Sequence, residues 1–412
     1  MRAPKKLLFT FFAIVFFISC LAYVYVHATY SATSRLQTLI NPPSDGQPNQ
    51  WLGADAATSI KISDQRYVWL FGDTILGVSN FPKRAPYPAI QGGFIHNSVG
   101  VANYEKGHWL PIQKYFRQGY KAIFSPVDSN YYYWVLAGAM VKGNLFLVAC
   151  RLHEPTRIVA THRSLQNSQV IQKKPQSMGI VGTTFLLVDN PQSPPDQWQV
   201  AKTWDVPGTN ALLNWYSAVV KTHNYLYIVG ERGQGLAAHT ILSRMTLADA
   251  ADGDWQQRKY YIGKHQWSQQ SAAVSISGLP GTSEMSIIRR HNKWYTLQVT
   301  WNAVKNNPRF IRYSITPYTA TQLIGPWTRR PDLYTPPAPW NTAMVDGVNT
   351  YSVYAPKLHP ELAQHGELVF TYNTNVNGLG LNPQQANTIF YHKIRTLRGL
   401  YIPQFFIMHP LM

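Results

Sequence analysis

Cysteine is nearly absent from this chain of 412 residues, because only Cys20 and Cys150 occur. Cys20 lies in an apolar N-terminal segment, which leaves a single thiol in the remainder of the chain. One cysteine cannot form an internal disulfide. The fold must therefore rest on apolar burial, and hydrophobic residues make up 45% of the chain, enough for a large core and too many for a disordered protein.

Acidic residues are also scarce, since 19 Asp and Glu stand against 37 Lys and Arg, for a net charge of +18. Three of these charges, Arg2, Lys5 and Lys6, precede the apolar segment, so the rest of the chain carries +15. Such a surface attracts anions such as lipid headgroups, acidic glycans or wall phosphates. A solvated basic face without a specific partner is the alternative. No nucleic-acid motif accompanies the charge, so nucleic acid is not an expected partner.

Several motifs that would carry other chemistry are missing. The 13 histidines show neither HExxH nor a regular metal-binding spacing, so we expect no metal. The Gly-rich run Gly230–Gly235 is not followed by a predicted helix, as a phosphate-binding loop requires, so we expect no nucleotide cofactor. No Gly-x-Ser-x-Gly motif occurs, and no helical periodicity of convincing length is visible. Aromatic residues make up 13% of the chain, which favours strands and also suits sugar binding, with core packing as the alternative.

The N-terminal segment is the one long apolar run. Leu7–Val26 carries no charge over 20 residues, enough for a helix of about 30 Å that crosses a bilayer. The basic residues before it favour a cytoplasmic N-terminus, which predicts that the rest of the chain is periplasmic or extracellular. We expect residues 1–32 to be a membrane anchor or signal peptide. An uncleaved anchor ranks first, cleavage near Ala28 or Ala32 second, and a lipid-modified Cys20 third.

Residues 33–50 contain Pro42, Pro43, Gly46 and Pro48 and are predicted to be a linker. After them, one pattern recurs five times: a short apolar strand, a polar turn and an aromatic-rich strand. The second strands of these hairpins centre near Val68, Phe146, Tyr227, Tyr295 and Val369, at spacings of 78, 81, 68 and 74 residues. A third strand and often a Trp-bearing segment follow each hairpin. After the fifth hairpin, the third strand is expected at Thr388–Ile394, followed by the segment Tyr401–Phe406.

This recurrence predicts an all-β fold, a five-bladed β-propeller over residues 51–412, with four strands in each blade and the chain ends meeting in or near one blade. A large β-sandwich is the main alternative. In a propeller the first strand of each blade lines the central axis. Residues just before the first strands or just after the second strands therefore face the mouth of the funnel.

Two acids occupy such positions in the first hairpin. Asp55 precedes the first strand and Asp73 follows the second, with the turn near Asp64 and Gln65. Antiparallel pairing about this turn places the two acids opposite each other to within one residue, and opposed Cα atoms lie about 4.5–5.5 Å apart. Two carboxyl groups at that distance suit general acid and base catalysis. Capping of turns is the alternative role.

Several segments resemble a bacterial five-bladed propeller family long catalogued as a domain of unknown function, whose members include endo-D-arabinanases. The resemblance covers roughly residues 50–405 and implies that Asp55 and Asp73 match the acidic pair of that family. In the second blade the sequence Tyr133–Leu136 departs from the Trp-Pro-Gly-like run expected there. The segments that carry the resemblance are Gly53–Asp55, Trp69–Thr74, His96–Ser98, Tyr354–Pro360 and Phe370–Asn375.

Other residues are predicted to contact substrate because they open a blade or follow a second strand. For each of them, core packing or turn hydrogen bonding is the alternative. Glu284 is a candidate third acid or sugar ligand, and aromatic rings at this mouth could stack on sugars. The predicted substrate-binding residues are His96, Asn97, Trp134, Trp215, Glu284, Tyr354, Asn373 and Asn375.

Two functions are compatible with these features. The first is a glycoside hydrolase that cleaves an envelope or extracellular glycan, with a furanoside-containing substrate implied by the resemblance. The second is a non-catalytic propeller that binds glycan or protein at the cell envelope. The acid pair favours the hydrolase, whereas the departure from the family pattern favours the binding module.

Overall fold

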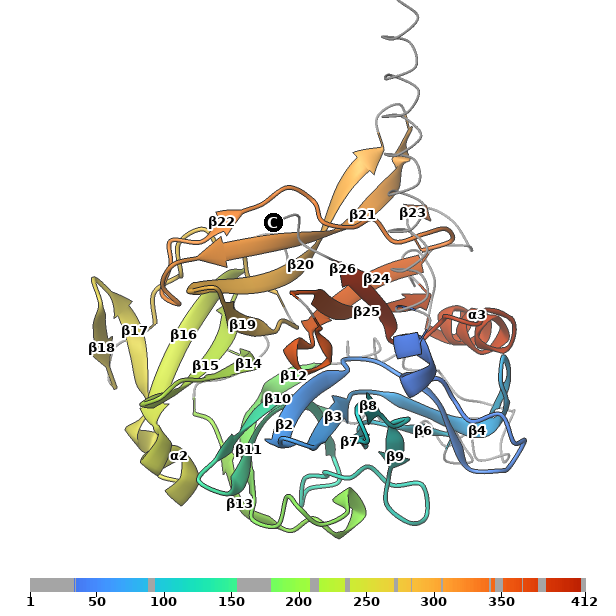
Figure 1. The fold of residues 1–412 in the computed structure, drawn as a ribbon, viewed down its shortest axis with the longest axis horizontal. Coiled ribbons are helices and arrows are strands. Elements are labelled where there is room, and N and C mark those ends of the chain that lie inside the picture. Colours follow the sequence, from blue (N-terminus) through green and yellow to red (C-terminus); the bar gives the residue numbers. More distant parts are fainter. Residues whose placement is uncertain are drawn as a thin grey trace, which may run out of the picture.

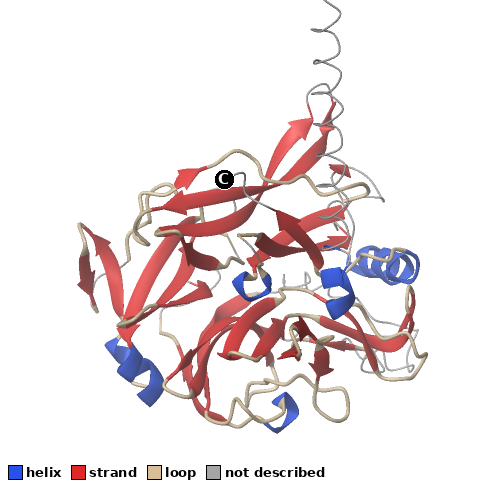
Figure 2. Cartoon of the chain, viewed as in Figure 1, coloured by secondary structure: helices blue, strands red, loops and turns tan. Residues whose placement is uncertain are grey.

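The computed structural model describes residues 33, 35–87, 93–153, 179–207, 215–233, 238–269, 273–282, 284–304, 307–340, 342–344, 351–364, 366–376 and 383–408. Over these residues the chain is mostly β, in six antiparallel sheets (Figures 1 and 2). The predicted membrane segment Leu7–Val26 lies outside them. Among the residues described, no helix is both long and apolar enough to cross a membrane.

Five of the sheets follow one another along the chain, and each begins with a hairpin. Sheet 1 contains β2 (Thr58–Ser63), β3 (Arg66–Phe71), β7 (Ser98–Glu105), β8 (His108–Trp109) and β9 (Gln113–Tyr115). Sheet 2 contains β10 (Tyr131–Val141), β11 (Asn144–His153), β12 (Ile180–Val188) and β13 (Val200–Asp205). Sheet 3 contains β14 (Trp215–Lys221), β15 (Tyr225–Arg232), β16 (His239–Thr246), β17 (Lys259–Gly263) and β18 (Gln266–Ser268).

The remaining two sheets of the series complete the circuit. Sheet 4 contains β19 (Ile287–Arg290), β20 (Lys293–Val304), β21 (Asn307–Ala320), β22 (Thr328–Arg329) and β23 (Thr342–Met344). Sheet 5 contains β24 (Tyr351–Leu358), β25 (Leu368–Val376) and β26 (Gln404–Met408). The helices α2 (Leu247–Asp252) and α3 (Pro383–Thr396) lie outside the sheets.

The five sheets form a ring around a central channel (Figure 1). A cavity of about 360 Å³ on the axis is lined by residues from the first strand of every sheet, namely β2, β10, β14, β19 and β24. The first strands therefore face the axis, as the hairpin pattern predicts. Five apolar clusters hold the ring together, because each lies between two successive sheets.

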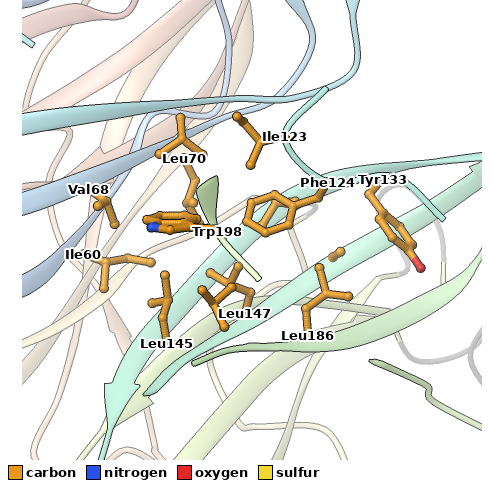
Figure 3. Packing of buried hydrophobic residues seen from close by; sticks show 14 of the residues in the cluster. Ile60, Val68, Leu70, Ile123, Phe124, Tyr133, Leu145, Leu147, Leu186 and Trp198 are labelled. Carbon is orange, nitrogen blue, oxygen red and sulfur yellow. The ribbon is translucent and has the colours of Figure 1, made fainter. Parts of the chain in front are cut away.

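The cluster between sheets 1 and 2 illustrates this packing (Figure 3). Val68 and Leu70 of sheet 1 face Leu145 and Leu147 of sheet 2, and all four are fully buried. Trp198 fills the gap between them, and its indole N–H donates to the carbonyl of Ser193 at 3.0 Å. Trp255 and Trp327 have the same role after the third strands of sheets 3 and 4, with indole bonds to backbone carbonyls at 3.1 Å. The recurring Trp-bearing segments are thus wedges between neighbouring sheets.

The fold prediction is confirmed in part. The all-β class and the ring of five hairpin-led sheets match it, but the sheets do not all have four strands. A sixth sheet, here the extension sheet, consists of β1 (Gln50–Ala54), β4 (Thr74–Asn80), β5 (Lys83–Pro86) and β6 (Phe94–Ile95). It continues the β2–β3 hairpin beyond Asp55 and Asp73, because β1 precedes β2 and β4 follows β3.

Two sequence-based expectations need correction. Thr388–Ile394, expected to be a strand, lies in α3, where Phe390 and Ile394 pack in one apolar cluster with residues of sheet 5; Leu397, directly after the helix, continues this helical spacing. Residues 33–50, expected to be a linker, include a helical turn at 35–40 whose Leu36 and Ile40 are buried. This turn binds the last strand of the ring, because the Gln37 side chain accepts a hydrogen bond from the Phe405 N–H at 3.0 Å. The first and last described segments therefore meet between sheets 5 and 1.

Candidate functional site

Asp55 and Asp73 lie where the first hairpin passes from sheet 1 into the extension sheet. Thr58 pairs with Leu70 on one side of them and Ala54 pairs with Thr74 on the other. Between these two ladders the Asp55 N–H donates to the Asp73 carbonyl at 3.4 Å. The two acids are therefore directly opposed, just after β3 and just before β2, the strand that lines the axial cavity, and the position of the turn predicts this opposition to within one residue.

The Asp55 carboxyl group lies in an enclosed pocket of aromatic hydroxyls. The hydroxyls of Tyr354 and Tyr401 each donate to its Oδ2 at 3.1 Å. Burial raises the pKa of Asp55 well above its ordinary value, and the charges of Asp73 and Glu284 raise it further, while the two tyrosine hydrogen bonds oppose these effects. On balance these surroundings favour the protonated form of Asp55.

Asp73 has different neighbours. The indole N–H of Trp134 donates to its Oδ1 at 2.7 Å, and Nδ1 of His96 lies 3.0 Å from the same oxygen. The imidazole of His96 in turn stacks on the ring of Tyr132, with centroids 3.6 Å apart. The start of β10 and the residues before β7 thus hold Asp73 between an indole and an imidazole.

A third acid from sheet 4 and a lysine from sheet 5 lie near these two acids. Glu284 lies just before β19, and its Oε2 is 3.9 Å from Nζ of Lys357 on β24. Lys357 is fully buried, and its ammonium group donates to the Met285 carbonyl at 3.2 Å. Burial raises the pKa of Glu284; Lys357 lowers it and Asp73 raises it further. The acids Asp55, Asp73 and Glu284, with Lys357, are called the acid cluster below.

The backbone around the acid cluster is strained. Non-glycine residues rarely adopt positive φ, and such strain concentrates at functional sites. Ala56 and Ala57, which directly follow Asp55, have φ of 67° and 58°. Ala355, which follows Tyr354, has φ of 48°, and Tyr401 itself has φ of 60°. Each of these residues has an unfavourable backbone conformation close to Asp55. The packing around them must therefore stabilise these conformations.

The structure brings together most of the predicted site residues. His96 and Trp134 contact Asp73, Tyr354 contacts Asp55, and Glu284 belongs to the acid cluster. Asn373 is fully buried and lies opposite Tyr354 in the β24–β25 ladder.

Three other predicted residues are placed differently. The side-chain amide of Asn97 fastens the loop after β9, because it donates to the Phe124 and Tyr133 carbonyls and accepts from the Phe124 N–H, at 2.8–3.0 Å. Asn375 accepts from the N–H of Val376 at 2.7 Å. The side chain of Trp215 lies outside the described residues; its backbone pairs with Glu231.

Sequence reasoning missed three residues of this region. Tyr401 opens the expected segment Tyr401–Phe406, but nothing in that pattern indicates that its hydroxyl reaches Asp55. Lys357 lies within a strand that sequence reasoning identified, but a buried lysine leaves no periodic signal. Glu231 could have been found, because it lies at the end of β15, the second strand of sheet 3, and follows Gly230 as Asp73 follows Gly72. Glu231 is buried, and with Glu284 it raises the pKa of the nearby Cys150 thiol, after the larger effect of burial.

The arrangement suits proton transfer by carboxyl groups. One acid has a raised pKa, and another faces it with hydrogen-bond donors to its oxygen, the kind of difference in environment that sets apart an acid and a base. Across the described ranges, no group of three or more His, Cys, Asp and Glu side chains is placed to hold a metal ion.

Replacing Trp134 with Phe is expected to lower kcat/KM of a reaction in which the Asp73 carboxylate takes part by roughly 10-fold or more, because a hydrogen bond to a charged group contributes about 1.5–3 kcal/mol. The measurement is a steady-state comparison with wild type. Trp109→Phe is the matched control, since Trp109 packs on Tyr67 and Tyr104 of sheet 1 and belongs to none of the contacts of Asp73. Equal values of kcat/KM for Trp134→Phe and wild type would show that the Trp134 indole does not contribute to the activity.

Comparisons with known proteins extend these observations. A family model described as "Domain of unknown function (DUF5005)" matches residues 46–409. A solved structure from Bacteroides ovatus, provisionally named a hydrolase, has a TM-score of 0.60 at 15% identity and covers 91% of this chain and 88% of its own. This likeness shows a shared fold. No curated protein matches the sequence.

Two weaker structural matches are to enzymes named for arabinose chemistry. The catalytic domain of a GH62 α-L-arabinofuranosidase from Coprinopsis cinerea has a TM-score of 0.42 at 11% identity, covering 90% of this chain and 95% of that one. An endo-arabinase from Bacteroides thetaiotaomicron has a TM-score of 0.41 at 12% identity, covering 90% and 97%.

Proposed function

The chain belongs to the DUF5005 family, and from this premise we propose that it is an exported glycoside hydrolase cleaving a furanoside-containing glycan of the envelope or the extracellular space. The observation that carries the proposal is the opposed pair Asp55 and Asp73, with only Asp55 surrounded by tyrosine hydroxyls. The motif resemblance to endo-D-arabinanases gives the substrate class. The ring of sheets serves as a five-bladed propeller.

In this proposal Asp55 is the general acid and Asp73 the general base or nucleophile. Glycosidic cleavage needs one protonated carboxyl group to donate to the leaving oxygen and one ionised carboxylate on the other side of the reacting carbon. Burial and the neighbouring charges keep the proton on Asp55. The Trp134 indole donates to Oδ1 of Asp73 and so fixes the orientation of that carboxyl group.

Glu284 tunes the acid in this scheme. Its negative charge raises the pKa of Asp55, so Glu284→Gln is expected to lower that pKa. A general acid loses activity as pH rises through its pKa, and the alkaline limb of the pH–rate profile should therefore move to lower pH. The measurement is kcat/KM against pH.

Glu361→Gln is the matched control for this profile. Glu361 is a buried acid 3.5 Å from His359 and is not among the charges that act on Asp55. An alkaline limb that stays in place for Glu284→Gln, or moves equally for Glu361→Gln, would contradict the proposed coupling.

A non-catalytic glycan-binding propeller is the second candidate. The observation in its favour is that two tyrosine hydroxyls already satisfy Asp55, as they would in a purely structural network. Co-sedimentation with insoluble glycan, combined with chromatography of the supernatant, separates the two candidates. The hydrolase shortens the chains and releases soluble fragments, whereas the binding module sediments with an intact glycan.

Export is part of the proposal and rests on Leu7–Val26 and its basic flank. A reporter that is active only in the cytoplasm, fused after residue 412, should give no signal. A strong signal would place the body of the protein in the cytoplasm and exclude an envelope substrate.

A further inference from the structure

A larger cavity, of about 750 Å³, lies between the helical turn at 35–40, β26 and the loop before β23. No residue of the acid cluster lines it. Its volume falls within the range of about 300–1,000 Å³ that is usual for small-molecule sites. It is here called the aromatic cavity, because its walls include the rings of Phe81, Tyr334, Trp340, Tyr372 and Phe406.

The two glutamine amides in these walls bond to the protein itself, whereas Oγ1 of Thr33 is buried without a hydrogen-bond partner among the described residues. The Gln37 amide donates to the Pro403 carbonyl at 3.1 Å and accepts from the Phe405 N–H. The Gln404 amide donates to the Ile402 carbonyl at 2.7 Å and to that of Gly399 at 3.1 Å. Rings face the remaining space, and Tyr334 packs on Phe406 with centroids 3.9 Å apart. Such walls suit an apolar ligand, which needs no hydrogen bonds.

A single cation stands among the lining residues of the aromatic cavity. Arg398 is exposed, and its guanidinium lies over the ring of Phe81, 4.9 Å from the centroid. No ion pair joins it to a carboxylate in the described part of the chain. An anionic head group on an apolar ligand would therefore meet Arg398 at the edge of the cavity.

The chain itself determines how far this cavity can lie from a membrane. Thr33 is one of its lining residues, and the uncharged segment ends at Val26. Seven residues extend by at most about 3.3–3.6 Å each, which is roughly 25 Å. If Leu7–Val26 spans the bilayer, the aromatic cavity is held within that distance of its outer surface.

We propose that the aromatic cavity binds an acyl chain of an anionic membrane phospholipid, with Arg398 paired to the phosphate. The inference rests on the membrane anchor proposed above and not on the hydrolytic activity. A lipid bound there docks sheet 5 and the turn at 35–40 on the membrane and orients the funnel relative to its surface. The basic balance of the chain acts in the same direction, because it attracts anionic headgroups.

The experiment uses the full chain reconstituted in vesicles that contain phosphatidylglycerol with a photoactivatable acyl chain. After irradiation, lipid adducts are mapped by mass spectrometry. Adducts are expected in residues 334–340 and 404–408 as well as in the apolar segment 7–26. Adducts in 7–26 alone would show an inserted chain with no lipid in the cavity and would overturn the proposal. Absence from both regions would overturn the anchor and the proposal together, while the hydrolytic activity could still stand.

Two variants and one control sharpen the result. Thr38→Trp places an indole on an exposed position that lines the cavity, and it should lower adducts at 334–340 and 404–408 by about fivefold or more without changing those in 7–26. Arg398→Glu should lower the preference for phosphatidylglycerol over phosphatidylcholine by about fivefold or more, since one charge near an anionic surface has an effect of that order. Arg395→Glu, an exposed change nearby that does not line the cavity, should leave the preference unchanged. Adducts unaffected by Thr38→Trp, or equal effects of the two arginine variants, would overturn the proposal.

Discussion

Replacing either Asp55 or Asp73 with Asn is expected to lower the rate of glycosidic cleavage by about 10²-fold or more. Each change keeps the shape of the side chain and removes its acid–base chemistry. Asp55→Asn removes the proton that burial and the charges of Asp73 and Glu284 hold on the carboxyl group. Asp73→Asn removes the carboxylate on which the Trp134 indole and His96 converge. The measurement is kcat/KM for released reducing ends, with folding checked by circular dichroism.

Asp332→Asn is the matched control for the two variants. Asp332 is an acid of sheet 4 that binds Arg329 and Thr316 at 2.8 Å and takes no part in the acid cluster. We expect it to cleave at the wild-type rate. A folded Asp55→Asn or Asp73→Asn protein that also cleaves at the wild-type rate would exclude that residue from catalysis and favour the binding module.

Replacing Gly72 with Ala is expected to cause a loss of similar size without touching a carboxyl group. A Cβ atom at Gly72 would lie 2.3 Å from Oδ1 of Asp55, far inside van der Waals contact. The Asp55 carboxyl group must move or rotate, and a misplacement of about 1 Å at a reacting group can lower the rate 10²-fold. The measurement is again kcat/KM, together with the thermal midpoint of unfolding.

Gly100→Ala separates misplacement from general destabilisation. Gly100 lies in β7 of the same sheet, and a Cβ there would meet Cγ2 of Ile112 at 2.5 Å, away from the acid cluster. We expect Gly100→Ala to lower the thermal midpoint while folded protein keeps its activity. If both variants lose activity in proportion to stability, Gly72 has no particular role in seating Asp55.

The hairpin pattern predicted the ring because each hairpin is local in sequence. The five second strands lie where the aromatic-rich runs predicted them, from β3 to β25. The opposition of Asp55 and Asp73 was predictable to within one residue for the same reason, since the turn near Asp64 sets the pairing of the hairpin. A register shift between Lys61 and Ser63, which the sequence did not predict, sets the final pairing. The register of the first hairpin was therefore enough to predict that Asp55 and Asp73 lie close together.

Contacts between distant segments were not predictable in this way. Tyr401 reaches Asp55 across 346 positions of sequence. It is held there by Arg84 of β5, whose guanidinium donates to the carbonyls of Leu52, Leu397 and Leu400. The local sequence does not indicate that β5 of the extension sheet contacts the residues that follow α3.

The helix α3 was missed although its signals are present. Pro383 stands at its first position, where proline is favoured, and Lys393 and Arg395 lie in its last turn, where cations are stabilised. The run Thr388–Ile394 is short and rich in apolar residues, and such a run does not distinguish a strand from a buried helix. The spacing of Phe390, Ile394 and Leu397, at i, i+4 and i+7, is the spacing of one face of a helix and would have distinguished the helix from a strand.

The central claim is that this protein cleaves a glycan with the acid cluster. The most direct test incubates wild type, Asp55→Asn and Asp73→Asn side by side with a panel of envelope glycans, including arabinofuranose polymers, and counts new reducing ends. The account predicts that wild type releases reducing ends from at least one furanoside-containing glycan and that both variants release about 10²-fold fewer or none. Cleavage by none of the three proteins, or equal cleavage by all of them, would contradict it.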